Sequence, residues 1–261
     1  MNTDGAEIPA ILIAGGLPMN VGNTIDRIAD AIAGLSARKA GTGATPCDTA
    51  QHSASAAQHS ASTAREKPGA LKTVYIGAAN GDSLPFYMMM KPLLGKAGAG
   101  EIEFIRLARD NADVGGARAA LECADIVFLS GGEVEDGINW INRHGLADLL
   151  RDLYKGGRLF IGVSAGTIML GSHWVKWGVE GDDSTSELFE CLGIVPQIFD
   201  THAENEDWIE LKAALKLMGR GSRGFGIPRG GIVAANGAGG LVNIEKKYLT
   251  FVYNGDGFDI T

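Results

Sequence analysis

The sequence has few cysteines, and they stand far apart from one another. Cys47, Cys123 and Cys191 form no CxxC pair and match no metal-ligand spacing. This argues against a zinc ribbon and against a framework of disulfide bridges. We therefore expect inert thiols in a reducing compartment, and we expect neither a metal nor a cofactor.

Long hydrophobic runs and basic stripes are also missing. No apolar stretch approaches the ~20 residues that cross a bilayer, and the acidic start MNTDGAEIPAILIAGG is unlike a secretory signal peptide. The net charge is −8, and Lys and Arg form no block, which disfavours nucleic acid as a partner. We expect a cytoplasmic protein that engages neither membrane nor nucleic acid. The sequence leaves open whether the protein forms a homodimer.

Apolar, strand-like segments alternate along the chain with segments of helical period. The expected strands are 10–16, 71–80, 101–108, 125–136, 158–164 and 193–202, and the expected helices include 23–35, 86–98, 138–157 and 204–219. Alternation of this kind predicts an α/β fold with a doubly wound, mainly parallel sheet and helices on both faces. The C-terminal tail is expected to be rich in short strands. We expect residues 1–261 to form a single domain.

One segment differs from the rest in composition. Residues 36–70 are rich in Ala, Ser, Thr, Gln and His, and contain the repeat AQHSASA followed by AQHSAST. Such a tract has almost nothing to bury, which predicts a disordered, low-complexity insertion. His52 and His59 lie within it; weak metal binding is conceivable for them, but a solvated tract is favoured.

The stretch RLFIGVSAGTIML places Ser164 between Gly162 and Gly166, after a strand-like run and before a helical one. Gly-x-Ser-x-Gly in this context is the nucleophile-elbow pattern, in which glycines keep neighbouring backbone free of collisions. The next N–H, that of Ala165, would lie at a helix N-terminus, where it can stabilise an oxyanion. The alternative is a serine that only caps the helix.

A nucleophilic serine needs a base, and the sequence offers five histidines. His202 is the best candidate because it ends an expected strand, as Ser164 does, and ligands of such sheets bind at the carboxyl ends of strands. The turn Gly131–Gly132 also follows a strand and could bring a second N–H to an oxyanion. Position in the sequence alone does not decide which acid completes the triad. The candidates are Glu180, Asp182, Asp183, Glu187, Glu190 and Asp200.

The motifs FLSGG, FIGVSAG and DTH, in this order, resemble the serine peptidases that include aspartyl dipeptidase E and cyanophycinase. That resemblance implies a fold like the class I glutamine amidotransferases, which is flavodoxin-like. It implies Ser164 as nucleophile, His202 as base, and the N–H groups of Gly132 and Ala165 as the oxyanion hole. Glu180 and Asp182 both meet the family's spacing for the third residue; we favour Glu180.

Two departures from the family pattern bear on the substrate. The oxyanion loop reads SGGEVED, so that Glu133 replaces an amide or a shorter acid. The segment after His202 is AENEDWIE, whose carboxylates would repel an acidic substrate and favour a free amine or a cationic side chain. The alternative is a solvated helix face.

Three functions compete at this stage. The leading hypothesis is a serine peptidase or amidohydrolase that cleaves a small peptide or peptide-like amide through an acyl-enzyme on Ser164. The second is a non-catalytic binding or regulatory protein that keeps the fold, which the altered SGGEVED loop motivates. The third is an α/β-hydrolase esterase, which is disfavoured because no histidine follows His202 and no HGGG-type loop is present.

Overall fold

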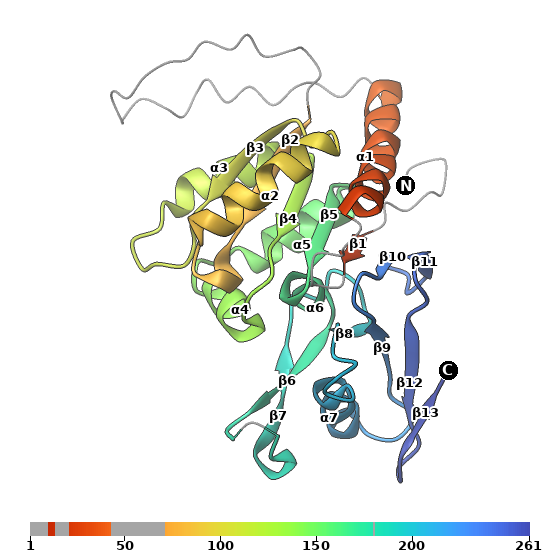
Figure 1. Cartoon of the computed structure of the whole chain (residues 1–261). Coiled ribbons are helices and arrows are strands. Elements are labelled where there is room, and N and C mark those ends of the chain that lie inside the picture. The colour runs from red at the N-terminus through yellow and green to blue at the C-terminus, as the bar shows by residue number, and fades with distance from the viewer. Residues whose placement is uncertain (1–9, 14–20, 43–70, 180) are drawn as a thin grey trace.

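The computed structural model describes residues 10–13, 21–42, 71–179 and 181–261. The strands are β1 (Ala10–Ile13), β2 (Lys72–Ile76), β3 (Glu101–Ile105), β4 (Ile126–Leu129), β5 (Leu159–Val163), β6 (His173–Trp177), β7 (Ser186–Glu190), β8 (Ile198–Thr201), β9 (Arg223–Ile227), β10 (Ile232–Ala235), β11 (Leu241–Glu245), β12 (Leu249–Tyr253) and β13 (Phe258–Ile260). The α-helices are α1 (Val21–Thr42), α2 (Leu84–Lys96), α3 (Val114–Cys123), α4 (Val134–Arg143), α5 (Ala147–Lys155), α6 (Ala165–Leu170) and α7 (Ile209–Met218), and the 3₁₀ turns are η2 (Ala78–Asn80) and η3 (Asp183–Thr185) (Figure 1).

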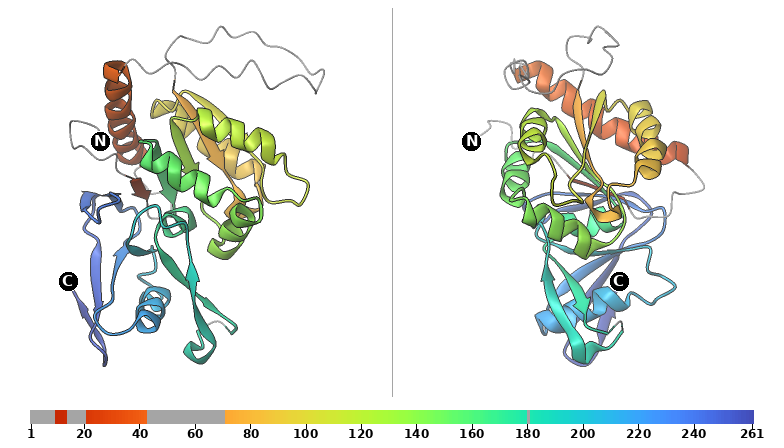
Figure 2. Two further views of the ribbon diagram at one scale, coloured as in Figure 1. Left: turned by 180° about the vertical axis from the view of Figure 1, so that it is seen from behind. Right: turned by 90° about the vertical axis from the view of Figure 1, so that its left-hand side faces the viewer.

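The central sheet has the strand order β11-β10-β1-β5-β4-β2-β3. The five strands from β1 to β3 in this order are parallel. Strand β10 pairs antiparallel with β1, and β11 pairs antiparallel with β10 at the edge of the sheet. Helices α3 and α5 cover one face and α1 and α2 the other (Figure 2). The predicted α/β fold with a mainly parallel sheet and helices on both faces is confirmed.

A hydrophobic core lies on each side of this sheet, because the buried strands carry apolar side chains on both faces. In β5, Phe160 packs toward α3 and α5, whereas Leu159 and Ile161 pack toward α1 and α2. Tyr75 of β2 stacks on Phe128 with ring centroids 5.2 Å apart. This packing fixes the strand ends from which the candidate site residues project.

A second sheet lies below the first and has the order β13-β12-β9-β8, with α7 packed on it around Trp208 and Phe251 (Figure 1). The predicted strand before His202 is present as β8, but it pairs with β9 in this second sheet and not with the central one. The antiparallel hairpin β6–β7 was not predicted. The alternation of buried and exposed side chains along β6 is weak, since only Val175 is fully buried.

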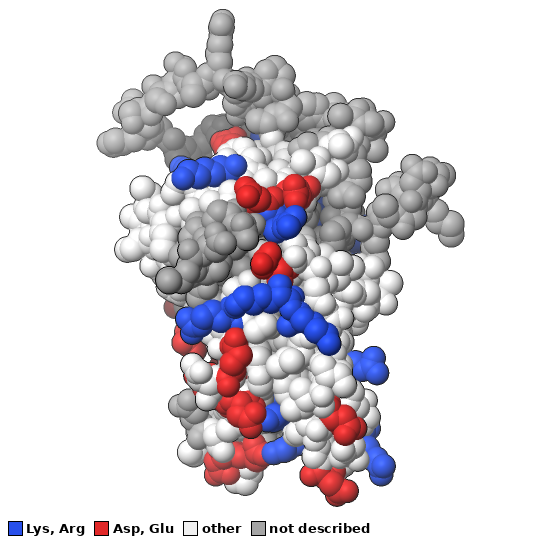
Figure 3. All heavy atoms as spheres, turned by 45° about the vertical axis from the view of Figure 1, so that its right-hand side comes forward, with Lys and Arg blue, Asp and Glu red and all other residues white. Residues whose placement is uncertain are grey.

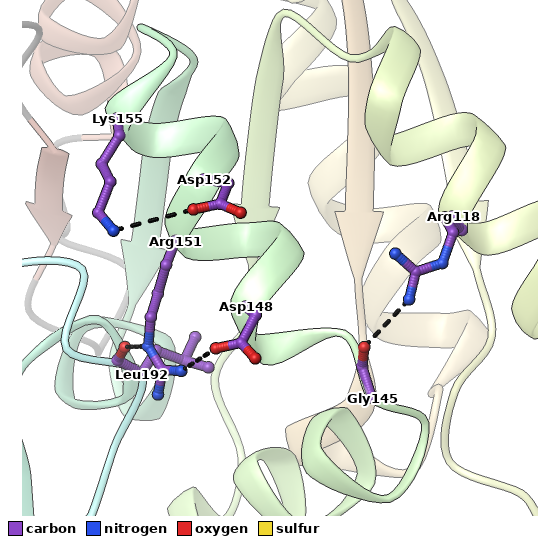
Figure 4. Close-up of polar contacts among 7 residues, drawn as sticks. All are labelled: Arg118, Gly145, Asp148, Arg151, Asp152, Lys155 and Leu192. Atoms are coloured by element: carbon purple, nitrogen blue, oxygen red, sulfur yellow. Dashed lines mark hydrogen bonds and ion pairs between the residues drawn. The ribbon is translucent and has the colours of Figure 1, made fainter.

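The single helix predicted over 138–157 is wrong, because the structure has two helices there, α4 and α5. Gly145 adopts a left-handed φ of 63°, which ends α4. Its carbonyl accepts a hydrogen bond of 3.1 Å from the guanidinium of Arg118 on α3 (Figure 4). The exposed side of α5 carries charged pairs, and Arg151 also donates to the Leu192 carbonyl at 2.7 Å (Figure 4).

The start of the predicted insertion also needs correction. Residues 36–42 continue α1, because Ala, Arg and Lys in this segment favour a helix even though they offer little to bury. Residues 43–70, which include His52 and His59, lie outside the described part of the chain. The expectation of three inert thiols is wrong for Cys123, which is disulfide-bonded, whereas Cys191 is a buried free thiol.

Charges of both signs share the surface. On the face drawn in Figure 3, a row of basic side chains crosses the middle and acidic side chains lie below it. Among the helices that the structure describes, none has the length and apolar character to pass through a bilayer.

Candidate active site

Ser164 occupies a sharp turn between β5 and α6. Its φ of 54° and ψ of −122° lie in a region that non-glycine residues rarely adopt, at a cost of about 1–3 kcal/mol. The turn is held on both sides: the Ser164 N–H donates to the Ile13 carbonyl at 2.9 Å. The buried Thr167 hydroxyl donates to the Gly162 carbonyl at 2.8 Å. Sequence reasoning missed Thr167, although a polar residue inside an apolar helix was a visible cue.

The two glycines that flank Ser164 are required by close backbone contact. A Cβ on Gly166 would lie 2.2 Å from the Leu129 carbonyl oxygen, and one on Gly162 would lie 2.6 Å from the Gly166 oxygen. Both contacts are far shorter than van der Waals distance, and the atoms met are backbone. The glycines therefore let α6 start directly over β4 and β5, as the elbow pattern predicts.

His202 follows β8 and meets Ser164 from the second sheet. Its Nε2 lies 2.8 Å from the Ser164 Oγ, which is a hydrogen-bond distance. The His202 N–H donates to the Ile227 carbonyl of β9 at 2.9 Å, and its φ of 49° turns the chain away from the strand. Although Ser164 stands at the N-cap position of α6, its side chain makes no capping bond. The structure thus brings together the two residues that the sequence predicted as nucleophile and base.

The glycine turn after β4 lies against Ser164. A Cβ on Gly131 would be 3.1 Å from the Ser164 Cβ and 3.7 Å from its Oγ. Gly132 is exposed and has a φ of 143°, and a Cβ there would be 2.0 Å from the Ala79 carbonyl oxygen. Ala165 is the first residue of α6, where backbone N–H groups have no partner within the helix. Gly131 therefore lies beside the Ser164 side chain, and the two predicted oxyanion residues directly follow Gly131 and Ser164 in the chain.

Glu180 was predicted as the third residue of the triad, with Asp182 as its competitor. Glu180 lies outside the described residues. The competitor Asp182 is fully exposed in the β6–β7 hairpin, where its carboxylate accepts from the Ser184 N–H at 2.9 Å and from the Ser184 hydroxyl at 2.6 Å. These bonds lower the pKa of Asp182. Within the described residues no hydrogen bond joins Asp182 to His202.

The acids after His202 are mostly engaged in structural contacts. The Glu204 carboxylate accepts from the Arg229 N–H at 2.7 Å, Asp207 pairs with Lys212 at 2.8 Å, and Glu210 accepts from the Trp174 indole at 2.9 Å. These contacts hold three of the four carboxylates within the fold, and the substrate preference expected from them stays a prediction. The predicted alternative was a solvated helix face: Glu204, Glu206 and Asp207 are exposed, but they lie in the turn before α7 and only Glu210 is within the helix.

The loop SGGEVED, in which Glu133 departs from the family pattern, holds that residue at the protein surface. Glu133 is exposed, and it occupies the N-cap position of α4 with a backbone N–H that donates to the Ala79 carbonyl at 2.7 Å. A carboxylate in that position is solvated, and it lies at the positive end of a helix dipole. It is not buried beside Ser164.

Asp200, two residues before His202, is a buried carboxyl group of a different kind. Its side chain is 2% exposed. One oxygen accepts the Thr201 N–H at 2.7 Å, and the other is buried near the Leu211 backbone without a well-formed hydrogen bond. Burial, reinforced by the nearby carboxylates of Glu210 and Glu206, raises the pKa of Asp200 to about 7. Asp200 thus faces α7.

Replacing Asp200 with asparagine is expected to flatten the pH dependence of stability. Below pH 3.8, the ordinary pKa of the group, the Asp200 carboxyl is protonated in both the folded and the unfolded protein. Between pH 3.8 and about 7 only the unfolded protein loses this proton. The free energy of unfolding therefore decreases over that range and levels off above it. The wild type should lose up to roughly 3 kcal/mol more than Asp200→Asn between pH 4.5 and pH 8. Urea unfolding at both pH values measures this. Equal losses in the two proteins would contradict it.

The sequence that carries this site matches a known protein family. Residues 49–238 match the model of peptidase family S51, and that range contains both Ser164 and His202. Two curated relatives match over 116 residues, or 42% of this chain: a cyanophycinase of Trichormus variabilis at 28% identity and a cyanophycinase of Nostoc sp. at 27%. The matched part spans 39% of the length of each of these relatives.

Two solved structures share the fold. A peptidase from an acI-B1 actinobacterium superposes with a TM-score of 0.61 at 16% identity, covering 98% of this chain and 95% of its own. A putative peptidase E protein from Listeria monocytogenes gives a TM-score of 0.50 at 17% identity, covering 70% and 90%. At these identities the likeness concerns the fold.

Proposed function

Because this chain belongs to peptidase family S51, we propose that it is a serine-type peptidase or amidohydrolase that cleaves a small peptide or peptide-like amide. The observation that carries the proposal is the 2.8 Å contact between the Ser164 Oγ and the His202 Nε2. It joins a serine in a strained elbow to a base that arrives from another sheet.

In the proposed reaction, His202 Nε2 takes the hydroxyl proton as Ser164 Oγ attacks the carbonyl carbon of the substrate. The N–H groups of Gly132 and Ala165 donate to the oxyanion of the tetrahedral intermediate. The imidazolium then gives its proton to the departing amine, which leaves an ester on Ser164. His202 next takes a proton from water as that water attacks the ester, and the imidazolium returns this proton to Ser164 Oγ as the acid leaves.

The third residue of the proposed triad would hold the imidazole of His202 and stabilise its positive charge. Glu180 remains our candidate, on the family resemblance. Asp182 is the weaker candidate, because its carboxylate is bonded to Ser184 within the hairpin.

Two features support a catalytic protein over the non-catalytic alternative. A regulatory protein with the same fold would have no use for the backbone strain at Ser164, which orients the hydroxyl. It would also have no need of a histidine within hydrogen-bond distance. The relatives named cyanophycinase and peptidase E support a peptide or peptide-like amide as the substrate.

A peptide-library cleavage profile of the purified protein tests the proposal and reads out specificity at the same time. We expect cleavage of short peptides by the wild type and none by Ser164→Ala. The profile should contain peptides with acidic, neutral and basic residues on either side of the scissile bond. Equal cleavage by both proteins, or none by a folded wild type across pH 6–9, would contradict it.

A further inference from the structure

The turn that carries Gly132 is held by a side chain from a different loop. The Asn80 amide, at the end of η2, donates through Nδ2 to the Gly131 carbonyl oxygen and to the Ser130 hydroxyl, both at 3.0 Å. Its Oδ1 accepts the Ser83 N–H at 3.0 Å. Asn80 is half-buried, so these bonds are partly shielded from water.

The bond to Gly131 acts on the neighbouring N–H through the geometry of the peptide. The carbonyl of Gly131 and the N–H of Gly132 belong to one planar trans peptide unit, in which the two groups point in opposite directions. A donor that fixes the carbonyl therefore also fixes the direction of the N–H. The Ser130 hydroxyl adds a second, longer contact to the same oxygen at 3.3 Å.

The rest of the turn fits closely on η2. The Glu133 N–H donates to the Ala79 carbonyl at 2.7 Å, and the Ser130 N–H donates to the Ile76 carbonyl at 3.0 Å. Gly132 approaches Ala79 so closely that no Cβ could be accommodated. The backbone is thus held at both ends of the turn, and the peptide between Gly131 and Gly132 is held by Asn80.

We propose that Asn80 is a positioning residue that aims the Gly132 N–H at the oxyanion by anchoring the Gly131 carbonyl. This inference rests on the proposed function of Ser164 and adds a residue outside the elbow and the histidine loop. Preorganised donors are effective because they do not have to reorient when charge develops. Without the Asn80 amide, the peptide unit between Gly131 and Gly132 can rotate, and the Gly132 N–H no longer points at the oxyanion.

The test compares Asn80→Ala, which removes the donor and adds no charge, with Ser83→Ala, which removes the side-chain cap of α2 beside it. We expect Asn80→Ala to lower kcat about 10- to 100-fold with little change in KM. Ser83→Ala should lower thermal stability, because it removes the bond from the Phe86 N–H. It should leave kcat unchanged, because the Gly131 carbonyl keeps the Asn80 amide as its partner.

A second readout separates positioning from general damage. A peptide aldehyde forms a tetrahedral adduct with an oxyanion, whereas a product peptide does not. We expect the affinity of Asn80→Ala for the aldehyde to fall by the same factor as kcat/KM, and its affinity for the product to stay unchanged. Asn80→Leu has the branched shape of asparagine, donates no hydrogen bond and adds no charge, so it carries the same test if the alanine variant fails to fold.

Two outcomes would overturn the proposal: activity and aldehyde affinity within twofold of wild type in the variants, or equal losses in aldehyde and product affinity. Ser164→Ala, measured in the same experiment, distinguishes a failure of the Asn80 proposal from a failure of the proposed serine mechanism. If Ser164→Ala is as active as wild type, the serine mechanism fails. If it is inactive while the Asn80 variants are normal, only the role of Asn80 fails.

Discussion

Replacing His202 with alanine is expected to lower kcat for peptide hydrolysis by about 10⁴- to 10⁶-fold. Ser164→Ala should cause a loss of similar size. The two residues act as one unit, because the hydroxyl is a weak nucleophile until Nε2, 2.8 Å away, accepts its proton. The double variant should therefore be no slower than either single variant.

Steady-state kinetics of the four proteins measures this coupling. His144→Ala is a suitable control, because the imidazole of His144 contacts the Leu107 carbonyl at 2.8 Å and has no role in the proposed reaction. It should retain the activity of the wild type. Losses that multiply in the double variant would show that Ser164 and His202 act independently, which contradicts the mechanism.

Replacing Gly166 with alanine is expected to damage both the fold and the activity. The new Cβ would meet the Leu129 oxygen at 2.2 Å and the Ser130 oxygen at 2.9 Å. Since backbone atoms cannot swing aside as a side chain can, α6 and the turn after β4 must move apart. We expect the free energy of unfolding to fall by about 1–3 kcal/mol and kcat/KM by about 100-fold, because small shifts of reacting groups are costly.

The matched control is Gly95→Ala in α2, a glycine whose added Cβ meets nothing within 4 Å. Alanine in a helix loses less conformational entropy than glycine on folding, so this variant should be as stable as the wild type or slightly more stable. Chemical denaturation and kinetics of both variants test the pair. A Gly166→Ala protein with normal stability and activity would contradict the close packing at the elbow.

The elbow could be predicted from sequence because its determinants are local. Gly162, Ser164 and Gly166 sit within one strand–turn–helix unit, and the steric demand of the turn selects their types. The strand before His202 was predicted for the same reason. Its place in the second sheet was not, because pairing with β9 depends on residues distant in sequence and leaves no mark on the strand itself.

Other errors have equally physical causes. The helix predicted over 138–157 has an apolar period that continues through Gly145, and the left-handed backbone there ends α4. The contacts of the carboxylates after His202 could not be predicted either. Their partners, such as the Arg229 N–H for Glu204 and the Trp174 indole for Glu210, come from distant parts of the chain and are visible only in the fold.

The central claim is that Ser164 is a nucleophile activated by His202, and covalent labelling tests it most directly. The folded wild type should react with a fluorophosphonate, and mass spectrometry of its peptides should place the adduct on Ser164. Ser164→Ala should not be labelled, and His202→Ala should be labelled far more slowly. A wild type that stays unlabelled across pH 6–9, or an adduct that persists in Ser164→Ala, would contradict the account.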